Sequence, residues 1–302
     1  MILVVGSINM DVSLQVTSIP RPGETVMSHG ILKSPGGKGA NQAVAAAKMG
    51  GRVAMLGCVG SDEHGSILVA SMNQSGVNTT DIQQISNVPS STAYICVSSC
   101  GENSIVVDSS ANMHVTPELL HQKEYLFEAA DYCVLQMEIP IESVRTAVAL
   151  SRKHNTKILL NPSPLNNFDI SLLDNIDFLI PNETEAASLI RKPFSETTDN
   201  DFLKLMKQHA IRNMVVTLGS DGAKLYDSTG NVTLFRQKPC KAIDTTGAGD
   251  TFLGAFVASI DSGMDLEQAI QLANVAAGIS VTRNGAQSSM PCKEEVLTRI
   301  AE

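Results

Sequence analysis

The segment GANQAVAAAKMGGRVAML, residues 39–56, decides the fold class. Its alanine-rich first part predicts a helix, because alanine has the highest helix propensity. The apolar residues VAML at 53–56 then predict a strand. A helix that runs directly into a strand is typical of α/β proteins.

The same alternation continues on both sides of this segment. ILVV at 2–5 is a β-branched and leucine run ended by Gly6, as expected for a strand buried on both faces in the middle of a sheet. Helical stretches separate the later apolar segments, which are 132–136, 157–160, 178–180 and 214–217. Helices are also expected at 63–76, 249–262, 265–282 and 293–301. The pattern predicts β-α-β units and a doubly wound, mostly parallel α/β sheet.

Two regions, near 12–33 and 91–108, follow a different pattern, because apolar and polar residues tend to alternate there. Alternation predicts strands with one face in water. We expect these strands to form a small sheet that covers the active-site edge as a lid, with Gly30, Gly36 and Gly37 as hinges. The sequence shows no internal repeat, and we interpret residues 1–302 as one domain.

Composition limits the possible partners. The chain has 302 residues, of which 43% are hydrophobic, enough for a substantial core. Its net charge is -9 and no run of Lys or Arg occurs, which argues against nucleic acid as a partner. MILVVGSINMD at the start has no basic leader or long apolar segment, and the six cysteines include no CxxC pair. We therefore expect a cytoplasmic protein with no membrane association.

The glycine-rich segment DTTGAGDTFLGAF at 244–256 runs directly into an apolar helix. Gly247 and Gly249 let backbone N–H groups approach an anion, and the helix start adds its positive dipole end. Asp250 is then placed to accept the proton of an attacking hydroxyl. Alternatively, Asp250 only caps the helix. The segment lacks the GxGxxG spacing of a dinucleotide site, which argues against a dehydrogenase. The chain also has no GxxxxGK[ST] phosphate loop, so its phosphate site is of another type.

Polar residues near the first strand are candidates for sugar recognition. Asn9 and Asp11 follow that strand, at the edge where open α/β sheets bind ligands, and a carboxylate can accept hydrogen bonds from two adjacent hydroxyls. Alternatively, both residues form a turn. Lys38 and Asn41 are either a solvated helix start or, with Gly37, lie against Asn9 and Asp11.

Eight segments in order resemble the ribokinase-like (PfkB-type) carbohydrate kinases. They are GSINMD (6–11), GGKGANQA (36–43), QMEIP (136–140), NPSP (161–164), PNETE (181–185), TLGSDG (217–222), DTTGAGD (244–250) and VTRNGAQSS (281–289). The resemblance covers nearly the whole chain. It implies a Rossmann-like fold with a lid, transfer of phosphate from ATP to the terminal 5-hydroxyl of a free pentose such as D-ribose, and a homodimer that pairs through the lid.

The resemblance also implies roles for the matching residues. Asp250 is the catalytic base, and the anion hole consists of Gly247, Ala248 and Gly249. The expected sugar contacts are Asn9, Asp11, Gly37, Lys38, Asn41, Glu138 and Asp250. The expected ATP contacts are Asn182, Thr217, Gly219, Gly222, Gly249 and Asn274. Glu185 is expected to bind Mg²⁺ through water, although Asn182 and Glu185 also fit a helix capping box. The positions expected around K⁺ are Asp244, Thr246, Ser280, Arg283, Gly285 and Ser289.

Several alternatives stay open at this stage. A 2-deoxyribose kinase would share the chemistry and differ at one hydroxyl contact. A nucleoside kinase is disfavoured, because the chain has no Trp and only 4% aromatic residues. A phosphorylated sugar would require more basic residues than Arg21, Lys33 and Lys38. A non-catalytic sugar-binding protein is disfavoured by the retention of Asp250. Ser110, where relatives often have glycine before Ala-Asn, leaves the local lid geometry undecided.

Overall fold

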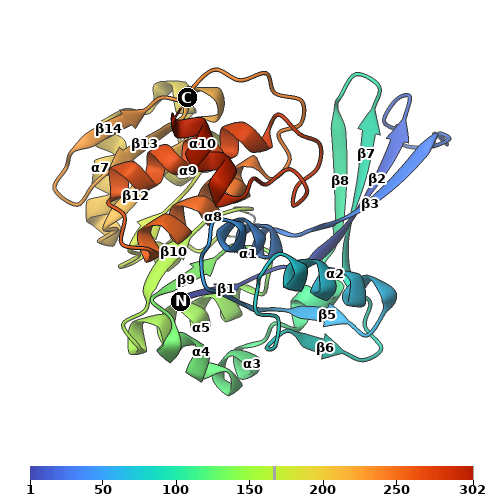
Figure 1. The fold of residues 1–302 in the computed structure, drawn as a ribbon, viewed down its shortest axis with the longest axis horizontal. Coiled ribbons are helices and arrows are strands. Elements are labelled where there is room, and N and C mark those ends of the chain that lie inside the picture. Colours follow the sequence, from blue (N-terminus) through green and yellow to red (C-terminus); the bar gives the residue numbers. More distant parts are fainter. Residues whose placement is uncertain (166–167, 302) are drawn as a thin grey trace.

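An eight-stranded sheet forms the centre of the computed structural model, which describes residues 1–165 and 168–301 (Figure 1). Its strands lie in the order β14 (Val232–Phe235), β13 (Ala223–Tyr226), β12 (Asn213–Thr217), β11 (Phe178–Leu179), β10 (Lys157–Leu160), β9 (Tyr132–Leu135), β1 (Ile2–Val5) and β4 (Val53–Leu56). All neighbours from β12 to β4 are parallel, and β13 and β14 are antiparallel additions. The predicted mostly parallel α/β class is confirmed.

Strand β1 is buried on both faces, as predicted, but it is not in the middle of the sheet. It pairs with β9 on one side and with the last strand, β4, on the other. Burial of both faces reports that helices cover both faces, and it carries no information about the distance to the sheet edge.

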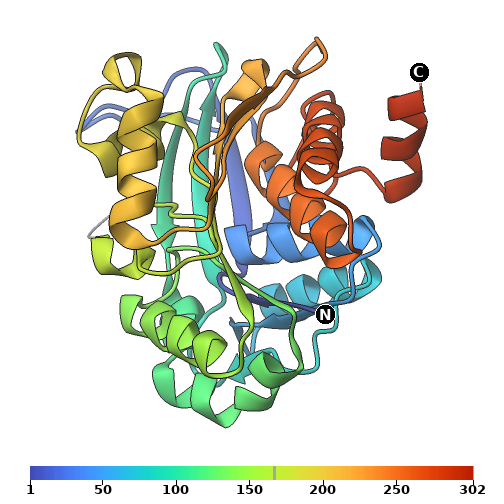
Figure 2. The ribbon, with the colours of Figure 1, turned by 90° about the vertical axis from the view of Figure 1, so that its left-hand side faces the viewer.

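Helices cover both faces of the large sheet (Figure 2). One layer contains α1 (Lys38–Lys48), α2 (Glu63–Gln74), α8 (Ala248–Asp261), α9 (Leu266–Ser280) and α10 (Lys293–Ala301). The opposite layer contains α3 (Pro117–Gln122), α4 (Glu124–Ala129), α5 (Ile141–Lys153), α6 (Glu183–Ile190) and α7 (Asp199–His209). The two layers enclose two hydrophobic cores: along β1, Ile2 and Val4 face the first, and Leu3 and Val5 face the second. In the described part of the chain, no helix is both long and apolar enough to cross a bilayer.

A separate four-stranded sheet projects from the body beside α1 and α2 (Figure 1). Its strands lie in the order β3 (Gly30–Gly36), β2 (Asn9–Val16), β7 (Ser91–Ser98) and β8 (Asn103–Asp108). This is the small sheet of the predicted fold class. Its strands differ from the expected ranges, since β2 begins at Asn9 and residues 17–29 form a loop. Whether the chain 1–302 is one domain stays a prediction.

The expectation of one wet face fails for β8, because every one of its residues is exposed. Ile105, Val106 and Val107 are about half exposed or more, at 53%, 68% and 47%. Alternation predicted that one face would be covered by this chain itself, but β8 is an edge strand that no helix of the described residues packs against.

Two strand pairs were not anticipated. The hairpin of β13 and β14 turns at residues 227–231, where Asp227 accepts hydrogen bonds from Thr229 and Asn231. The pair of β5 (Cys58–Gly60) and β6 (Gln83–Ile85) flanks α2. Both pairs consist of short strands that give little periodicity.

Helices α1 and α8 cross at very close range. A Cβ atom at Gly254 would overlap the Cβ of Ala45 and would lie 2.7 Å from the Gln42 carbonyl oxygen. The absent side chain therefore lets the backbones touch. This contact places the first turns of both helices beside each other, at the end of the sheet where β1 and β9 finish.

Candidate active site

The Asp250 carboxylate lies in the first turn of α8 and is buried. Its two oxygens accept separate hydrogen bonds from α1: Asn41 Nδ2 donates to Oδ2 at 3.0 Å and Gln42 Nε2 donates to Oδ1 at 2.9 Å. The N-cap of α8 is Gly247, with φ 72°, and Asp250 makes no capping hydrogen bond. The alternative in which Asp250 only caps the helix is therefore wrong.

The charge state of Asp250 reflects opposing influences. Burial raises its pKa, and the Glu138 carboxylate adds to this; the Lys38 ammonium and the hydrogen bonds from Asn41 and Gln42 lower the pKa but only partly offset the rise. Burial lowers the pKa of Lys38 in turn, but the carboxylates of Asp250, Glu138 and Glu185 outweigh that effect and raise it overall. Lys38 therefore stays charged next to the carboxylate, which favours ionised Asp250.

Asn9 and Asp11 lie in strand β2, so the turn alternative is wrong for both. Asn9 is buried, and its Oδ1 accepts a hydrogen bond from Asn112 Nδ2 at 2.7 Å. A Cβ at Gly36, on the neighbouring strand β3, would overlap the Asp11 carboxylate. The Asp11 carboxylate thus occupies the space that Gly36 leaves open.

Asp11 belongs to a cluster of three carboxylates with Glu138 and Asp250. Burial raises the pKa of Asp11 to about 7, and the charges of Glu138 and Asp250 raise it too. Glu138 follows β9, and its Oε2 accepts hydrogen bonds from Ser7 Oγ at 2.5 Å and from the backbone N–H of Lys38 at 3.1 Å. The arrangement offers several acceptor oxygens to the hydroxyl groups of a sugar.

Gly37 and Asn41 complete the predicted sugar side. Gly37 has φ 88°, and a Cβ there would lie 2.7 Å from the backbone nitrogen of Asn9. Only glycine fits this left-handed position. Asn41 is buried and bonded to Asp250, so a solvated helix start is excluded. Its side-chain contact in this structure is with Asp250.

A cavity of about 200 Å³ opens beside Asp250. Its lining combines the start of α8 with the ends of β10, β11 and β12, and comprises Lys38, Asn161, Ser163, Ile180, Asn182, Glu185, Thr217, Thr245, Gly247, Ala248, Gly249, Asp250 and Leu253. The predicted anion-hole residues and three predicted nucleotide residues meet here. Backbone N–H groups at a helix start are suited to bind phosphate.

Asn182 and Glu185 form a capping box at the start of α6 and also line this cavity. The Glu185 backbone N–H donates to Asn182 Oδ1 at 2.8 Å, and the Asn182 backbone N–H donates to Glu185 Oε2 at 2.9 Å. The two interpretations of this motif, a helix cap and part of a nucleotide site, are therefore compatible. Among the described residues, Asn182 Nδ2 and Glu185 Oε1 make no hydrogen bond, and both side chains belong to the cavity lining.

The remaining predicted nucleotide residues lie around β12 and α9. Gly219 and Gly222 form the turn after β12, with φ 52° and 101°, and a Cβ at Gly222 would overlap the Phe235 carbonyl oxygen. Asn274, buried in α9, donates to that same carbonyl oxygen at 3.0 Å. Asn274 thus ties α9 to β14, and with Phe235 it lines a surface groove.

Two loops bring the predicted cation positions together. Asp244 Oδ1 accepts hydrogen bonds from Thr246, and Oδ2 accepts one from the backbone N–H of Gly285 at 2.8 Å. The hydroxyls of Ser280 and Ser289 donate to the carbonyl oxygens of Ala277 and Ala286. These side chains are therefore occupied in shaping the two loops.

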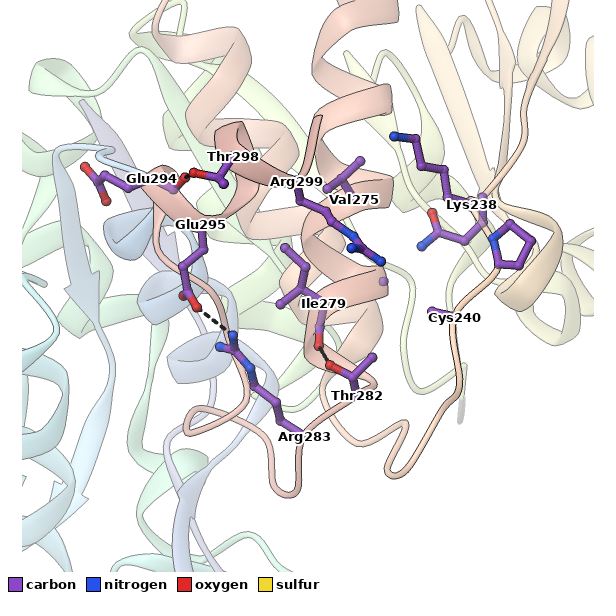
Figure 3. Close-up of a pocket in the computed structure, with 13 residues that line it drawn as sticks. Lys238, Cys240, Val275, Ile279, Thr282, Arg283, Glu294, Glu295, Thr298 and Arg299 are labelled. Atoms are coloured by element: carbon purple, nitrogen blue, oxygen red, sulfur yellow. Dashed lines mark hydrogen bonds and ion pairs between the residues drawn. The ribbon is translucent and has the colours of Figure 1, made fainter. Parts of the chain in front are cut away.

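The Arg283 side chain extends away to α10, where its Nη2 donates to Glu295 Oε1 at 2.5 Å (Figure 3). It lines a groove of about 580 Å³ between α9, α10 and residues 237–240. Of the predicted site residues, this groove contains Arg283 alone. Only the backbone of Arg283 is therefore available to the loop around Asp244.

Several polar residues around Asp250, Asn9 and Glu138 were not predicted. They are the buried Ser7, Gln42, Asn112, Gln136 and Gln287, and the half-buried Asn161. Gln136 and Asn161 directly follow β9 and β10, and Ser7 lies two residues after β1. The rule that selected Asn9 and Asp11 would therefore have found all three. Gln42 carried a different signal, as a polar residue inside the apolar run of α1.

Comparison with known proteins agrees with this geometry. Residues 1–293 match the pfkB family carbohydrate kinase model. The chain is 37% identical to a ribokinase of Haemophilus influenzae over 97% of its own length and 96% of the relative. It is 35% identical to a deoxyribokinase of Salmonella typhi, over 97% and 96%. The structure of an Arabidopsis thaliana ribokinase complexed with ribose and ATP superposes with a TM-score of 0.91 at 31% identity, over 98% and 97%.

The family match spans nearly the whole chain and includes both the sugar side and the glycine-rich start of α8. The buried carboxylate of Asp250 lies between them. The chain therefore belongs to the pfkB family of carbohydrate kinases and is an ATP-dependent sugar kinase.

Proposed function

We propose that this enzyme transfers the γ-phosphate of ATP to the 5-hydroxyl of D-ribose and releases ribose 5-phosphate and ADP. The observation that carries the proposal is the position of Asp250, between the acceptor-rich sugar side and the cavity at the start of α8. Relatives named ribokinase, at 36–37% identity over nearly the full chain, support ribose as the sugar.

The residues suggest how the transfer proceeds. Asp250 accepts the proton of the 5-hydroxyl as the hydroxyl oxygen forms its bond to the γ-phosphorus, and the bond from that phosphorus to the β-phosphate oxygen breaks. Backbone N–H groups of Gly247, Ala248 and Gly249 stabilise the negative charge on the transferred group. Lys38, near Asp250 and lining the same cavity, adds positive charge.

Two metal ions fit the donor groups. Glu185 would hold Mg²⁺ through water, because Mg²⁺ prefers oxygen ligands and keeps several waters, while Asn182 would contact the phosphates. The loops joined by Asp244 and Gly285 would hold K⁺ with backbone carbonyl oxygens. Bound Mg²⁺ would neutralise charge on the phosphates, and bound K⁺ would stabilise the loop that precedes the anion hole.

The second candidate is 2-deoxyribose, because a deoxyribokinase is nearly as similar to this chain as the ribokinases. The number of acceptors near Asp11 favours the sugar with the additional hydroxyl. A site built to bond a hydroxyl rejects the analogue that lacks it by up to about 10⁴–10⁵.

An ATP-coupled assay with Mg²⁺ tests the proposal. Ribose, 2-deoxyribose, fructose and adenosine are compared with and without K⁺, beside Asp250→Ala. We expect K⁺-stimulated turnover of ribose, and a loss of about 10²–10⁴ in the variant. A preference for 2-deoxyribose would change the assigned substrate and leave the mechanism unchanged. If neither pentose is phosphorylated, the proposal is refuted.

We also propose a homodimer through the small sheet and a cytoplasmic location. Leu32, Ile105 and Val107 are exposed, and by strand register they share the face of Asp11. A second small sheet would cover them. The six cysteines are all unpaired, which suits a reducing compartment. Light scattering that gives a monomer at micromolar concentration would refute the dimer.

A further inference from the structure

Neutral amides hold both oxygens of Asp250, although a charged lysine is nearby. Gln42 Nε2 donates to Oδ1 and Asn41 Nδ2 donates to Oδ2. Both amides come from the first turns of α1, and Gln42 is 1% exposed. With two donors in fixed places, the plane of the carboxylate is fixed as well.

An amide can do this only if its N–H end faces the carboxylate, because the oxygen end would repel it. Gln136 sets the orientation of Gln42: its Nε2 donates to Gln42 Oε1 at 2.7 Å. Gln287 does the same for Asn41, with its Nε2 3.2 Å from Asn41 Oδ1. The four amides form one directed chain that ends on Asp250 from both sides.

In this orientation the carbonyl oxygen of the Gln136 side chain is left without a hydrogen bond from the described part of the chain. Its Oε1 is buried and has no hydrogen-bond partner within the described residues. A Cβ at Gly6 would overlap that oxygen, so Gly6 provides the space for it. An apolar side chain of the same length would fill the site without an orphaned carbonyl oxygen. Packing therefore does not explain a glutamine here, whereas the N–H group given to Gln42 does.

We propose that Gln42, oriented by Gln136, is a positioning residue that aims the Asp250 carboxylate at the attacking hydroxyl and keeps it ionised. The proposal rests on the proposed function of Asp250 as the base. Gln42 acts only through Asp250. The charged groups that face Asp250 from other positions are Lys38 on α1, Glu138 after β9 and Asp11 on β2.

The test compares Gln42→Met and Gln136→Met with the intact enzyme. A hydrogen bond to the ionised form lowers the pKa of a carboxyl group, so its loss raises that pKa. For Gln42→Met we expect kcat to fall at least about tenfold at neutral pH, with a smaller change in the KM for ribose. The acid limb of the kcat–pH profile moves to higher pH. Gln136→Met moves it in the same direction by less.

A matched control separates positioning from loosening of the fold. Val44→Ala also alters a buried residue of α1, but Val44 packs in the hydrophobic core and its side chain has no group that could donate a hydrogen bond to the Asp250 carboxylate. This variant should lower Tm and leave the pH profile unchanged. A Gln42→Met profile identical to that of Val44→Ala would overturn the proposal.

A measurement that does not depend on catalysis distinguishes failure of the positioning proposal from failure of the proposed function. ¹³C NMR of aspartate carboxyl groups, with the Asp250 signal assigned by its loss in Asp250→Asn, gives the pKa of Asp250 directly. An upward shift in Gln42→Met and in Gln136→Met supports the orienting chain even if ribose is not the substrate. An unchanged Asp250 pKa in both variants refutes it even if ribose is phosphorylated.

Discussion

Asn182 and Glu185 bond to each other twice, since each side chain accepts the backbone N–H of the other at the start of α6. The same two side chains line the cavity beside Asp250. One pair of residues therefore both caps the start of a helix and presents oxygen to the proposed nucleotide site. The two roles can be separated by substitution.

Glu185→Gln should retain the helix cap, because glutamine also serves at the third position of a capping box. It removes the charge proposed to attract Mg²⁺. We expect an unchanged Tm and a rise of about tenfold in the Mg²⁺ concentration for half-maximal activity. Glu185→Ala should show the same rise together with a lower Tm. Equal Mg²⁺ requirements in Glu185→Gln and the intact enzyme would contradict the assignment.

Asp11 should make stability depend on pH. In the folded protein burial raises its pKa from its usual value near 4 to about 7, so the folded state keeps a proton that the unfolded state has lost. The free energy of unfolding therefore falls as pH rises between about 4 and about 7. Asparagine does not titrate, so in Asp11→Asn the free energy of unfolding does not fall for this reason.

The difference in Tm between Asp11→Asn and the intact enzyme, measured without sugar, should be small near pH 4 and should grow in favour of the variant up to about pH 7. It should then remain constant. A difference that does not change over this pH range would show that Asp11 titrates normally.

Gly36→Ala should act on the sugar through Asp11. The added Cβ overlaps the Asp11 carboxylate, while the φ angle at Gly36 is not in the left-handed region. We expect the KM for ribose to rise about tenfold, equivalent to about 1.4 kcal/mol, with little effect on the KM for ATP. Gly30→Ala is the control on the same strand, because its Cβ would lie 3.5 Å from Gln15 Cγ, an ordinary contact. Equal effects of both substitutions would argue against a role of Asp11 in sugar binding.

Asp244→Asn tests the cation loops. Asparagine can still accept the hydrogen bond from Thr246 with its oxygen. Its NH₂ group would then face the backbone N–H of Gly285, and the hydrogen bond that Asp244 accepts from Gly285 would be lost. The loops should separate, and the concentration of K⁺ needed for activation should rise. Melting curves in KCl against choline chloride give a readout independent of activity: K⁺ should raise the Tm of the intact enzyme and have less effect on the variant. No effect of K⁺ on either protein would refute the proposed cation site.

The sequence predicted the fold class because its central strands are short but continuous apolar runs separated by helical stretches. The position of β1 and the full exposure of β8 were missed, since neighbours far along the chain decide both. The cluster around Asp250 was only partly predicted. Asn9, Asp11 and Glu138 follow strands or carry charge, whereas Gln42 and Gln136 are neutral, and their role depends on the direction in which each amide points.

The close crossing of α1 and α8 at Gly254 also bears on how the enzyme fails when heated. Gln42 and Asn41 stand on one helix and Asp250 on the other, and their distance is set where the two backbones touch, within the hydrophobic core. The Asp250 carboxylate should therefore keep its two amide donors for as long as that core stays packed. We expect the Asn41 and Gln42 contacts to be lost together with the core on heating, and not before it.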